Sequence, residues 1–214
     1  YTSLDKYVEN MPENQKQIYF VTGEGRDGAA MSPVVEKLTS RGFEVLFATE
    51  PLDEIMFESL RNFKDIDVVD AAKENLKVDE EEGDEAKKQK EDLNREFISV
   101  IEFLETLLSD KVQKVTVSTD LTDSPAALVQ GAFGMSPTMQ RYMRAQAVAS
   151  GDNDLPMGKL TKAVMEINAN HPIIRDLDAM IKADKESPAT QDFAMLLYDV
   201  AGMTLGYEGS NKKR

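Results

Sequence analysis

The fold is decided by residues 17–49, QIYFVTGEGRDGAAMSPVVEKLTSRGFEVLFAT, in which a helix-like segment lies between two strand-like segments. β-Branched and aromatic residues dominate 17–22 and 43–49, which predicts two buried strands. Residues 33–42 are predicted to be helical, and Gly42 is a typical residue at a helix end. A strand, a helix and a second strand in this order predict a parallel pair of strands with the helix covering the sheet.

The segments on either side extend this pattern. Ser3 is a suitable N-cap for a short helix to about residue 10. Residues 52–63 predict a third helix, and 67–71 a third short strand. Three apolar residues of that helix are expected to point inward: Ile55, Leu60 and Phe63. The first 75 residues are therefore expected to form a small αβα sandwich around a parallel sheet.

A charged stretch follows, at residues 73–91. Six of the seven residues from Asp79 to Glu85 are acidic, which is typical of a linker or of the frayed start of a helix. Apolar residues then recur at helical spacing, which predicts a helix of several turns with one apolar face. These residues are Leu93, Phe97, Val100, Ile101, Leu104, Leu107 and Leu108.

The remainder of the chain predicts a second, α+β domain with a three-stranded sheet and several helices. Its strands are expected at 112–119, 126–131 and 163–168, and two further helices begin at Pro172 and near Thr190. The predicted division is a domain at 1–75, an acidic linker at 76–91 and a domain at 92–214.

One more helix is predicted within FGMSPTMQRYMRAQAV, residues 133–148. Ser136 is a suitable N-cap, with Pro137 at the first helical position, where a missing N–H costs nothing. Four apolar residues share one side: Met135, Met139, Tyr142 and Met143. Arg141 and Arg144 lie on the other face. The apolar stripe fits either a packed core or an adaptable surface for apolar partners, because methionine is flexible and polarizable.

Composition excludes several classes of function. The net charge of −14 argues against nucleic-acid binding, which needs clustered Lys and Arg. The absence of cysteine excludes disulfides, cysteine zinc sites and thiol catalysis. A single histidine excludes His-rich metal sites, and no apolar run approaches the ~20 residues that cross a membrane. The chain starts without Met and ends in a polar EGSNKKR, so a fragment is expected.

The sharpest enzyme-like pattern is GEGRDG, Gly23 to Gly28. It matches G-x-G-x-x-G after a strand, and Glu50 stands where a ribose-binding acid is expected, so a dinucleotide-binding enzyme is the alternative interpretation. Two features speak against a dinucleotide site. Pro33 interrupts the helix that would have to run unbroken behind the phosphates of the dinucleotide. The αβα unit is also too small to supply the second half of a dinucleotide-binding fold. The other interpretation is a loose loop between strand and helix.

His171 with Asp176 or Asp178 resembles a catalytic pair, but its place beside Pro172 favours a helix cap. Neither a Gly-x-Ser-x-Gly elbow nor a metal-ligand spacing is present in the sequence. By elimination the chain is predicted to be a binding and assembly module without catalytic residues.

Several long motifs closely resemble the heat shock protein 90 family of ATP-driven chaperones. In order they are SLDKYVENMPENQKQIYFVTGE (3–24), RGFEVLFATEPLDE (41–54), DKVQKVTVSTDLTDSPAALV (110–129), FGMSPTMQRYMRAQA (133–147) and EINANHPIIRDL (166–177). The resemblance covers nearly the whole chain. It implies that residues 1–75 are the last αβα part of the middle domain and that 92–214 is the C-terminal dimerisation domain, without the family's final helix.

The resemblance also implies that ATP hydrolysis and client binding are carried out by different parts of the protein. The family's ATP and Mg²⁺ site and its catalytic arginine lie in parts that this chain does not contain, so this part is expected to carry no cofactor and no ATPase activity. The expected function is to bind client proteins and to hold a homodimer together, with co-chaperones as further partners and neither nucleic acid nor membrane. Met135, in FGMS, resembles bacterial and mitochondrial members rather than cytosolic FGWS, so the location is cytoplasmic or organellar, the mitochondrion included.

Two sets of residues carry the expected functions. The family's client-binding positions match Met135, Met139, Tyr142 and Met143. An apolar face of the last predicted helix is expected at the dimer interface, formed by Phe193, Leu196, Leu197, Val200 and Met203.

Overall fold

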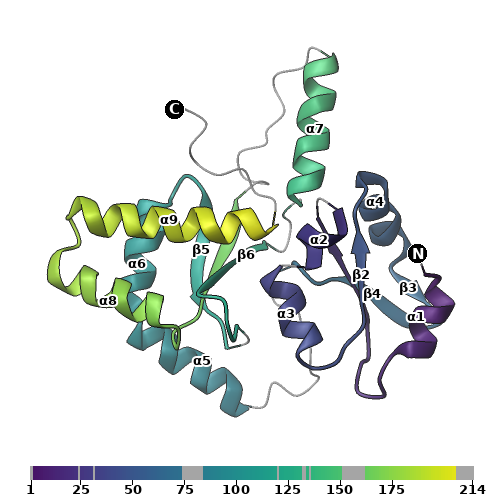
Figure 1. The fold of residues 1–214 in the computed structure, drawn as a ribbon, viewed down its shortest axis with the longest axis horizontal. Helices are drawn as coiled ribbons and strands as arrows, with labels where there is room; N and C mark the ends of the chain where they lie inside the picture. Colours follow the sequence, from purple (N-terminus) through teal and green to yellow (C-terminus); the bar gives the residue numbers. More distant parts are fainter. Residues whose placement is uncertain are drawn as a thin grey trace.

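The structure is a computed structural model, and in it the chain forms two units, each built on a small sheet (Figure 1). It describes residues 2–23, 25–30, 32–73, 84–119, 121–131, 134, 136–150 and 162–205. The first unit ends at residue 73 and the second begins at residue 84, on either side of the acidic stretch. All statements below concern these residues.

The first sheet has four strands in the order β2-β1-β4-β3. Its strands are β1 (Ile18–Thr22), β2 (Val45–Ala48), β3 (Asn62–Phe63) and β4 (Ile66–Asp70). As predicted, β1 runs parallel to both β2 and β4. The sheet also contains a strand that was not predicted, β3, which pairs antiparallel with β4. Lys64 and Asp65 between them both have positive φ, which a tight two-residue hairpin turn requires.

Helices cover both faces of this sheet, which confirms the αβα sandwich. They are α1 (Leu4–Asn10), α2 (Gly25–Ala30), α3 (Pro33–Thr39) and α4 (Pro51–Leu60). Alternate residues of β1 point to opposite faces. Tyr19 and Val21 pack with α2 and α3, whereas Phe20 packs with Phe57 of α4 and with α1. Strand β1 is therefore buried on both sides and forms the centre of the unit.

The orientation of α4 corrects one prediction. Ile55 was expected to point inward, but it is 43 % exposed. The buried residues of the helix are Glu54 and Phe57, three positions apart, and Leu60 is half-buried beside them. Phe63 lies in β3, beyond the end of the helix. The inward face of α4 is thus set by the aromatic contact of Phe57 with Phe20, whose rings stack 4.9 Å apart.

The second sheet has the three strands that the sequence predicts, in the order β5-β7-β6. They are β5 (Val112–Val117), β6 (Ala126–Gln130) and β7 (Ala163–Ile167). The central strand β7 runs parallel to β5 and antiparallel to β6. The sheet is mixed, and helices pack on it to make the largest hydrophobic core of the described residues.

The helices of this unit are α5 (Asp84–Glu96), α6 (Ile98–Leu107), α7 (Pro137–Ser150), α8 (Pro172–Asp184) and α9 (Pro188–Leu205). The long predicted helix is divided at Phe97, and its first part begins at Asp84, within the stretch assigned to the linker. All seven residues of its predicted apolar face are buried or half-buried against the core. His171 caps α8, accepting a hydrogen bond from Ile173 N to its Nδ1 at 3.2 Å, as predicted.

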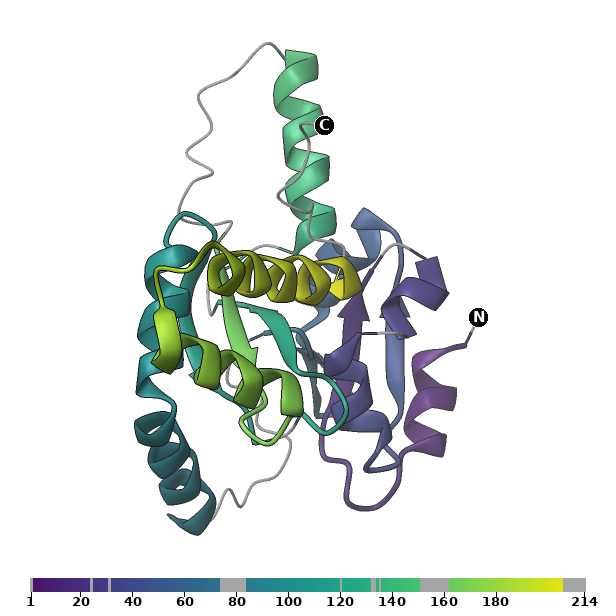
Figure 2. The same cartoon turned by 60° about the vertical axis from the view of Figure 1, so that its left-hand side comes forward.

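The two units share a strip of apolar side chains. Val129 of β6 and Val164 of β7 belong to the same buried cluster as Tyr19, Val34 and Leu38 of the first unit. The backbone of β6 also reaches the first unit, because Gln130 N donates to Ala72 O at 2.7 Å. The two sheets thus lie side by side, as a view turned by 60° shows (Figure 2). Among the described helices, none combines the length and apolar character needed to cross a membrane.

Candidate functional site

Helix α7 is attached to the molecule at its first turn. Ser136 is completely buried, and its Oγ accepts a hydrogen bond from Met139 N at 3.0 Å, which confirms the predicted N-cap. The same hydroxyl donates to the carboxylate of Glu54 on α4, which is 3 % exposed. Gln140, one turn along, is also buried. The start of α7 is therefore fixed to α4 of the first unit.

Beyond this turn, α7 leaves the body of the protein. It extends away from both sheets in both views (Figures 1 and 2). Tyr142 is 44 % exposed, whereas Met139 and Met143 are half-buried. On the other face, Arg141 is half-buried and Arg144 is exposed. Met135, the fourth residue of the predicted stripe, lies outside the described residues. The described part of the stripe is thus partly open to solvent.

Helix α4 adds exposed apolar residues that were not predicted from the sequence. Leu52, Ile55 and Met56 are all exposed, although Phe57 and Leu60 of the same helix pack inward. Their spacing of i, i+3 and i+4 marks a second helical stripe, and this signal could have identified them. Because α4 contacts α7, these side chains lie on the helix next to the methionine stripe. We call Leu52, Ile55, Met56, Met139, Tyr142 and Met143 the α4–α7 surface.

The five residues of α9 that were predicted for the dimer interface lie on two different sides of the helix. Leu197 is 5 % exposed and belongs to the core, and Phe193 is half-buried against it. Leu196, Val200 and Met203 are exposed and recur at i, i+4 and i+7, so they form one stripe on the outer side. The structure therefore brings three of the five residues together on the surface and places two inside.

The glycine-rich segment is part of the fold. Gly25 begins the six-residue helix α2, and a Cβ on Gly23 would lie 2.9 Å from the Cβ of Ala29, so a side chain there would clash. Glu50, the expected ribose ligand, is instead the N-cap residue of α4, and its backbone N–H donates to Oδ2 of Asp53 at 3.1 Å. The described geometry of these residues gives the dinucleotide alternative no support.

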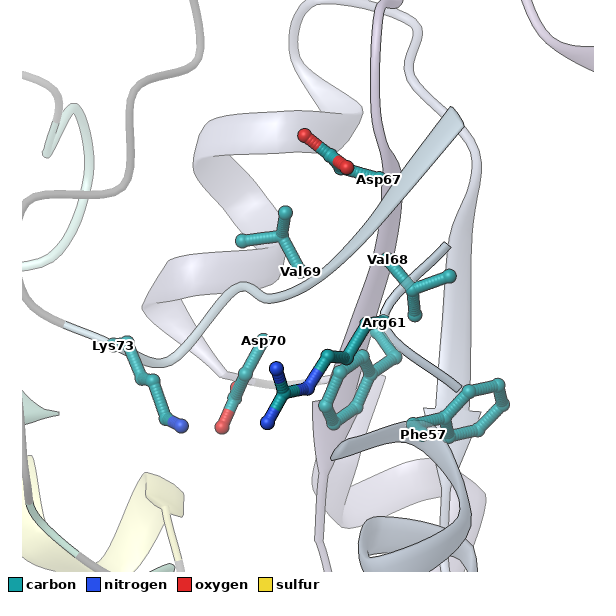
Figure 3. Close-up of a pocket in the computed structure, with 8 residues that line it drawn as sticks. Phe57, Arg61, Asp67, Val68, Val69, Asp70 and Lys73 are labelled. Atoms are coloured by element: carbon teal, nitrogen blue, oxygen red, sulfur yellow. The ribbon is translucent and has the colours of Figure 1, made fainter. Parts of the chain in front are cut away.

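A pocket of about 420 Å³ lies beside β4 and α4. Figure 3 shows Arg61 and Lys73 extending toward Asp70 from two sides, with Phe57 nearby and Asp67 at a distance. Asp70 is buried, and its Oδ1 accepts a hydrogen bond from Ala72 N at 2.9 Å, which fixes the chain after β4. The hydrogen bond from Ala72 N gives the carboxylate of Asp70 a structural role in this pocket. Within the described part of the chain, no group of three His, Cys, Asp or Glu side chains is placed to hold a metal ion.

The titratable groups with shifted pKa values are structural. Burial raises the pKa of Tyr7 to about 12. The hydrogen bonds that its hydroxyl accepts from Tyr19 N and Gln15 lower the pKa, but their effect is smaller than that of burial. Burial, with Asp199 and Asp110 nearby, raises the pKa of Tyr198. Burial raises the pKa of Glu36, but hydrogen bonds from Thr122, Asp123 and Ser124 outweigh it and give a lowered value. None of these groups belongs to the α4–α7 surface.

Comparison with known proteins gives a consistent result. The sequence model of the Hsp90 protein family matches residues 1–214. The chain is 40 % identical over 206 residues to "Heat shock protein 90-5, chloroplastic" from Arabidopsis thaliana, covering 96 % of this chain and 26 % of the relative. It is 36 % identical over 202 residues to "Putative heat shock protein HSP 90-beta-3" from Homo sapiens, covering 94 % of this chain and 33 % of the relative.

Among solved structures, one similar chain is the middle domain of a Plasmodium falciparum putative heat shock protein. It is 44 % identical in the matched part, with a TM-score of 0.32, and the match covers 33 % of this chain and 30 % of that one. The chain spans about a quarter to a third of the length of the curated relatives it matches.

Proposed function

The chain belongs to the Hsp90 family, and from this premise we propose that it is the part of an ATP-driven chaperone that binds non-native client proteins and holds two copies together. Hydrolysis of ATP with Mg²⁺ is proposed for the whole protein, with the nucleotide bound outside these residues. The expected partners are client proteins, a second copy of the chain and co-chaperones. The chloroplastic relative and the FGMS sequence favour an organelle as the compartment.

The observation that carries the client-binding proposal is the α4–α7 surface. Leu52, Ile55 and Met56 expose apolar area to solvent on α4, the helix that contacts α7, and Tyr142 does so on α7. Exposed apolar groups gathered on neighbouring elements mark interaction sites more often than isolated ones do. Thioether side chains adapt their shape to different partners, which suits a protein that binds many unfolded sequences. Each client side chain that is well buried there would contribute about 1.5–3 kcal/mol.

The client-binding proposal is tested with two pairs of substitutions in α7. Met139→Ser with Met143→Ser should leave the protein folded but weaken suppression of aggregation of a heat-unfolded test protein, measured by light scattering. The control pair is Ala145→Ser with Ala149→Ser, at exposed positions of the same helix. It introduces the same residue twice and should leave suppression unchanged. Equal suppression by both pairs, or unfolding of the methionine pair alone, would contradict the proposal.

A third pair tests whether α4 takes part. Ile55→Ser with Met56→Ser changes the first unit, and it should weaken suppression in addition to the effect of the methionine pair. Both side chains are exposed, so circular dichroism should report an unchanged fold. Unchanged suppression would restrict the client surface to α7.

The homodimer proposal is supported by the outer stripe of α9. Leu196, Val200 and Met203 expose a continuous apolar edge, and a second copy would bury it. A stripe of three residues is small for a stable interface, which usually buries about 800 Å² on each partner. Self-association of this chain is therefore expected to be weak, and sedimentation equilibrium would measure it.

A further inference from the structure

The carboxylate of Glu36, in the middle of α3, binds the turn at residues 122–124 of the second unit. Its Oε1 accepts hydrogen bonds from the Thr122 hydroxyl and from Asp123 N, the latter at 3.0 Å. Its Oε2 accepts from the Ser124 hydroxyl at 3.1 Å. Three donors from one turn thus converge on one side chain from the other unit.

The turn itself is held in shape from its own unit. Asn168, which is buried after β7, donates through Nδ2 to Thr122 O at 3.2 Å and to Ser124 O at 3.3 Å. Both hydroxyl-bearing residues are therefore presented by a fixed backbone. The lowered pKa of Glu36 agrees with a carboxylate that is stabilised in its charged form by these donors.

A second carboxylate also joins the units, but in a different environment. Glu54 and Ser136 are buried and lie on α4 and at the start of α7, on the opposite face of the first sheet from α3. The apolar strip of Val129 and Val164 against Val34 adds contact on the α3 side. Thr122 and Asp123 are exposed, so of these two carboxylate contacts it is the Glu36 contact that can exchange its partners for water without opening the interior.

We propose that Glu36 and residues 122–124 form a releasable clasp that sets the angle between the two units. With the clasp closed, α3 is tied to the turn before β6 and the units have one relative orientation. With the clasp released, the units can change their relative orientation about the contacts that remain between them, which are the apolar strip of Val129 and Val164, the Gln130–Ala72 hydrogen bond and the Glu54–Ser136 contact. A negative charge placed on Thr122 or Ser124 would replace a donor by an anion facing a carboxylate, and would hold the clasp open.

Distance measurements between spin labels test the proposal. The chain has no cysteine, so Asn14→Cys and Lys185→Cys, at exposed positions of the two units, accept one label each. Labelled protein is diluted with unlabelled protein so that only pairs within one chain contribute. A single narrow distance distribution is expected for the unchanged clasp. Glu36→Ala and Thr122→Glu should each add a second distance population or broaden the first.

Two further variants control the interpretation. Asp123→Asn should leave the distribution unchanged, because only the backbone N–H of Asp123 contacts Glu36. Thr122→Val keeps the shape of the side chain but removes its hydroxyl, and should broaden the distribution less than Glu36→Ala does. In parallel, hydrogen exchange of the Asp123 amide should accelerate at least tenfold in Glu36→Ala, because its acceptor is removed.

The outcomes separate the proposal from general destabilisation. If Glu36→Ala keeps the narrow distribution, or if Asp123→Asn broadens it equally, the clasp does not set the angle. If Glu36→Ala unfolds the chain, Thr122→Val and Thr122→Glu still decide, because both lie on the exposed side of the contact. An unchanged distribution in both would overturn the proposal.

Discussion

Helices α7 and α9 both present apolar side chains to solvent, but they are attached to the protein differently. Helix α9 lies along the second unit, contacting α8, β6 and α2, and buries one side along most of its length. The buried residues include Ala194, Leu197, Tyr198 and Ala201. Helix α7 has its main contact with α4, is buried only in its first turn, and is largely exposed from Arg144 onward.

This difference indicates what each stripe can bind. The outer stripe of α9 has a fixed geometry because the opposite side is set in the core, so it suits a partner of fixed shape, such as a second copy. The stripe of α7 carries flexible methionines on a helix held at one end, so it suits partners of varied shape. Each of the following predictions would break or sharpen this contrast.

The largest effect is expected from Leu197→Ala on the buried side of α9. Leu197 is enclosed by the main core, so truncation leaves a cavity and should lower the free energy of unfolding by about 2–5 kcal/mol. Leu196→Ala, one residue away but 62 % exposed, should cost less than about 1 kcal/mol. Urea denaturation of both variants measures the difference. If both substitutions lowered the free energy of unfolding equally, the interpretation that α9 packs on the core through one side would be wrong.

The second effect concerns the attachment of α7 at its first turn. Ser136→Ala removes both the cap for Met139 N and the donor for the buried carboxylate of Glu54, with a cost of about 1–3 kcal/mol. The loss should be local, so hydrogen exchange should accelerate along α7 and not along α9. Ser99→Ala, at an exposed position of α6, is the control. Uniform acceleration in both helices would remove the contrast between them.

Much of this contrast follows from the sequence, because helical periodicity shows which residues of one helix share a face. It predicted the helices α7 and α9, the caps Ser3, Ser136 and His171, and the described strands other than β3. Periodicity does not show which neighbour covers a face. That is why Ile55 was expected inside, and why the five residues of α9 were treated as one surface.

Contacts between distant segments were beyond sequence reasoning for the same reason. Glu36 and Glu54 are ordinary acidic residues in helices, and nothing local marks them as partners of hydroxyls more than 80 positions away. The hairpin strand β3 was missed because two residues are too few for a periodic signal. The client and dimer roles of the predicted residues remain predictions, which the experiments described here test.

The third prediction tests the outer stripe of α9. Leu196→Ser with Val200→Ser should weaken self-association about tenfold or more, because two apolar side chains would lose their burial against a second copy. Sedimentation equilibrium measures the dissociation constant. Leu52→Ser with Met56→Ser, which changes equally exposed residues of α4, should leave it unchanged. If the α4 pair weakens association instead, the functions assigned to the two surfaces must be exchanged.

The smallest effect is expected from alkaline pH, and it probes the buried side of α9 through Tyr198. Burial, with Asp199 and Asp110 nearby, raises the pKa of Tyr198 above its ordinary value of 10.0, so the folded state retains a proton that the unfolded state loses. The stability from this residue is therefore complete below pH 10 and falls as pH rises through the folded pKa.

Tyr7 behaves in the same way in the first unit, with a folded pKa of about 12, so the protein as a whole should lose stability in this range. Tyr7 is present both in Tyr198→Phe and in the unchanged protein, so its loss of stability cancels when the two are compared. The melting temperature of Tyr198→Phe should fall less between pH 9 and pH 11, because phenylalanine has no proton to lose. If the melting temperature of Tyr198→Phe falls as steeply as that of the unchanged protein, Tyr198 does not couple proton loss to folding, and the buried side of α9 is not a source of the alkaline loss of stability.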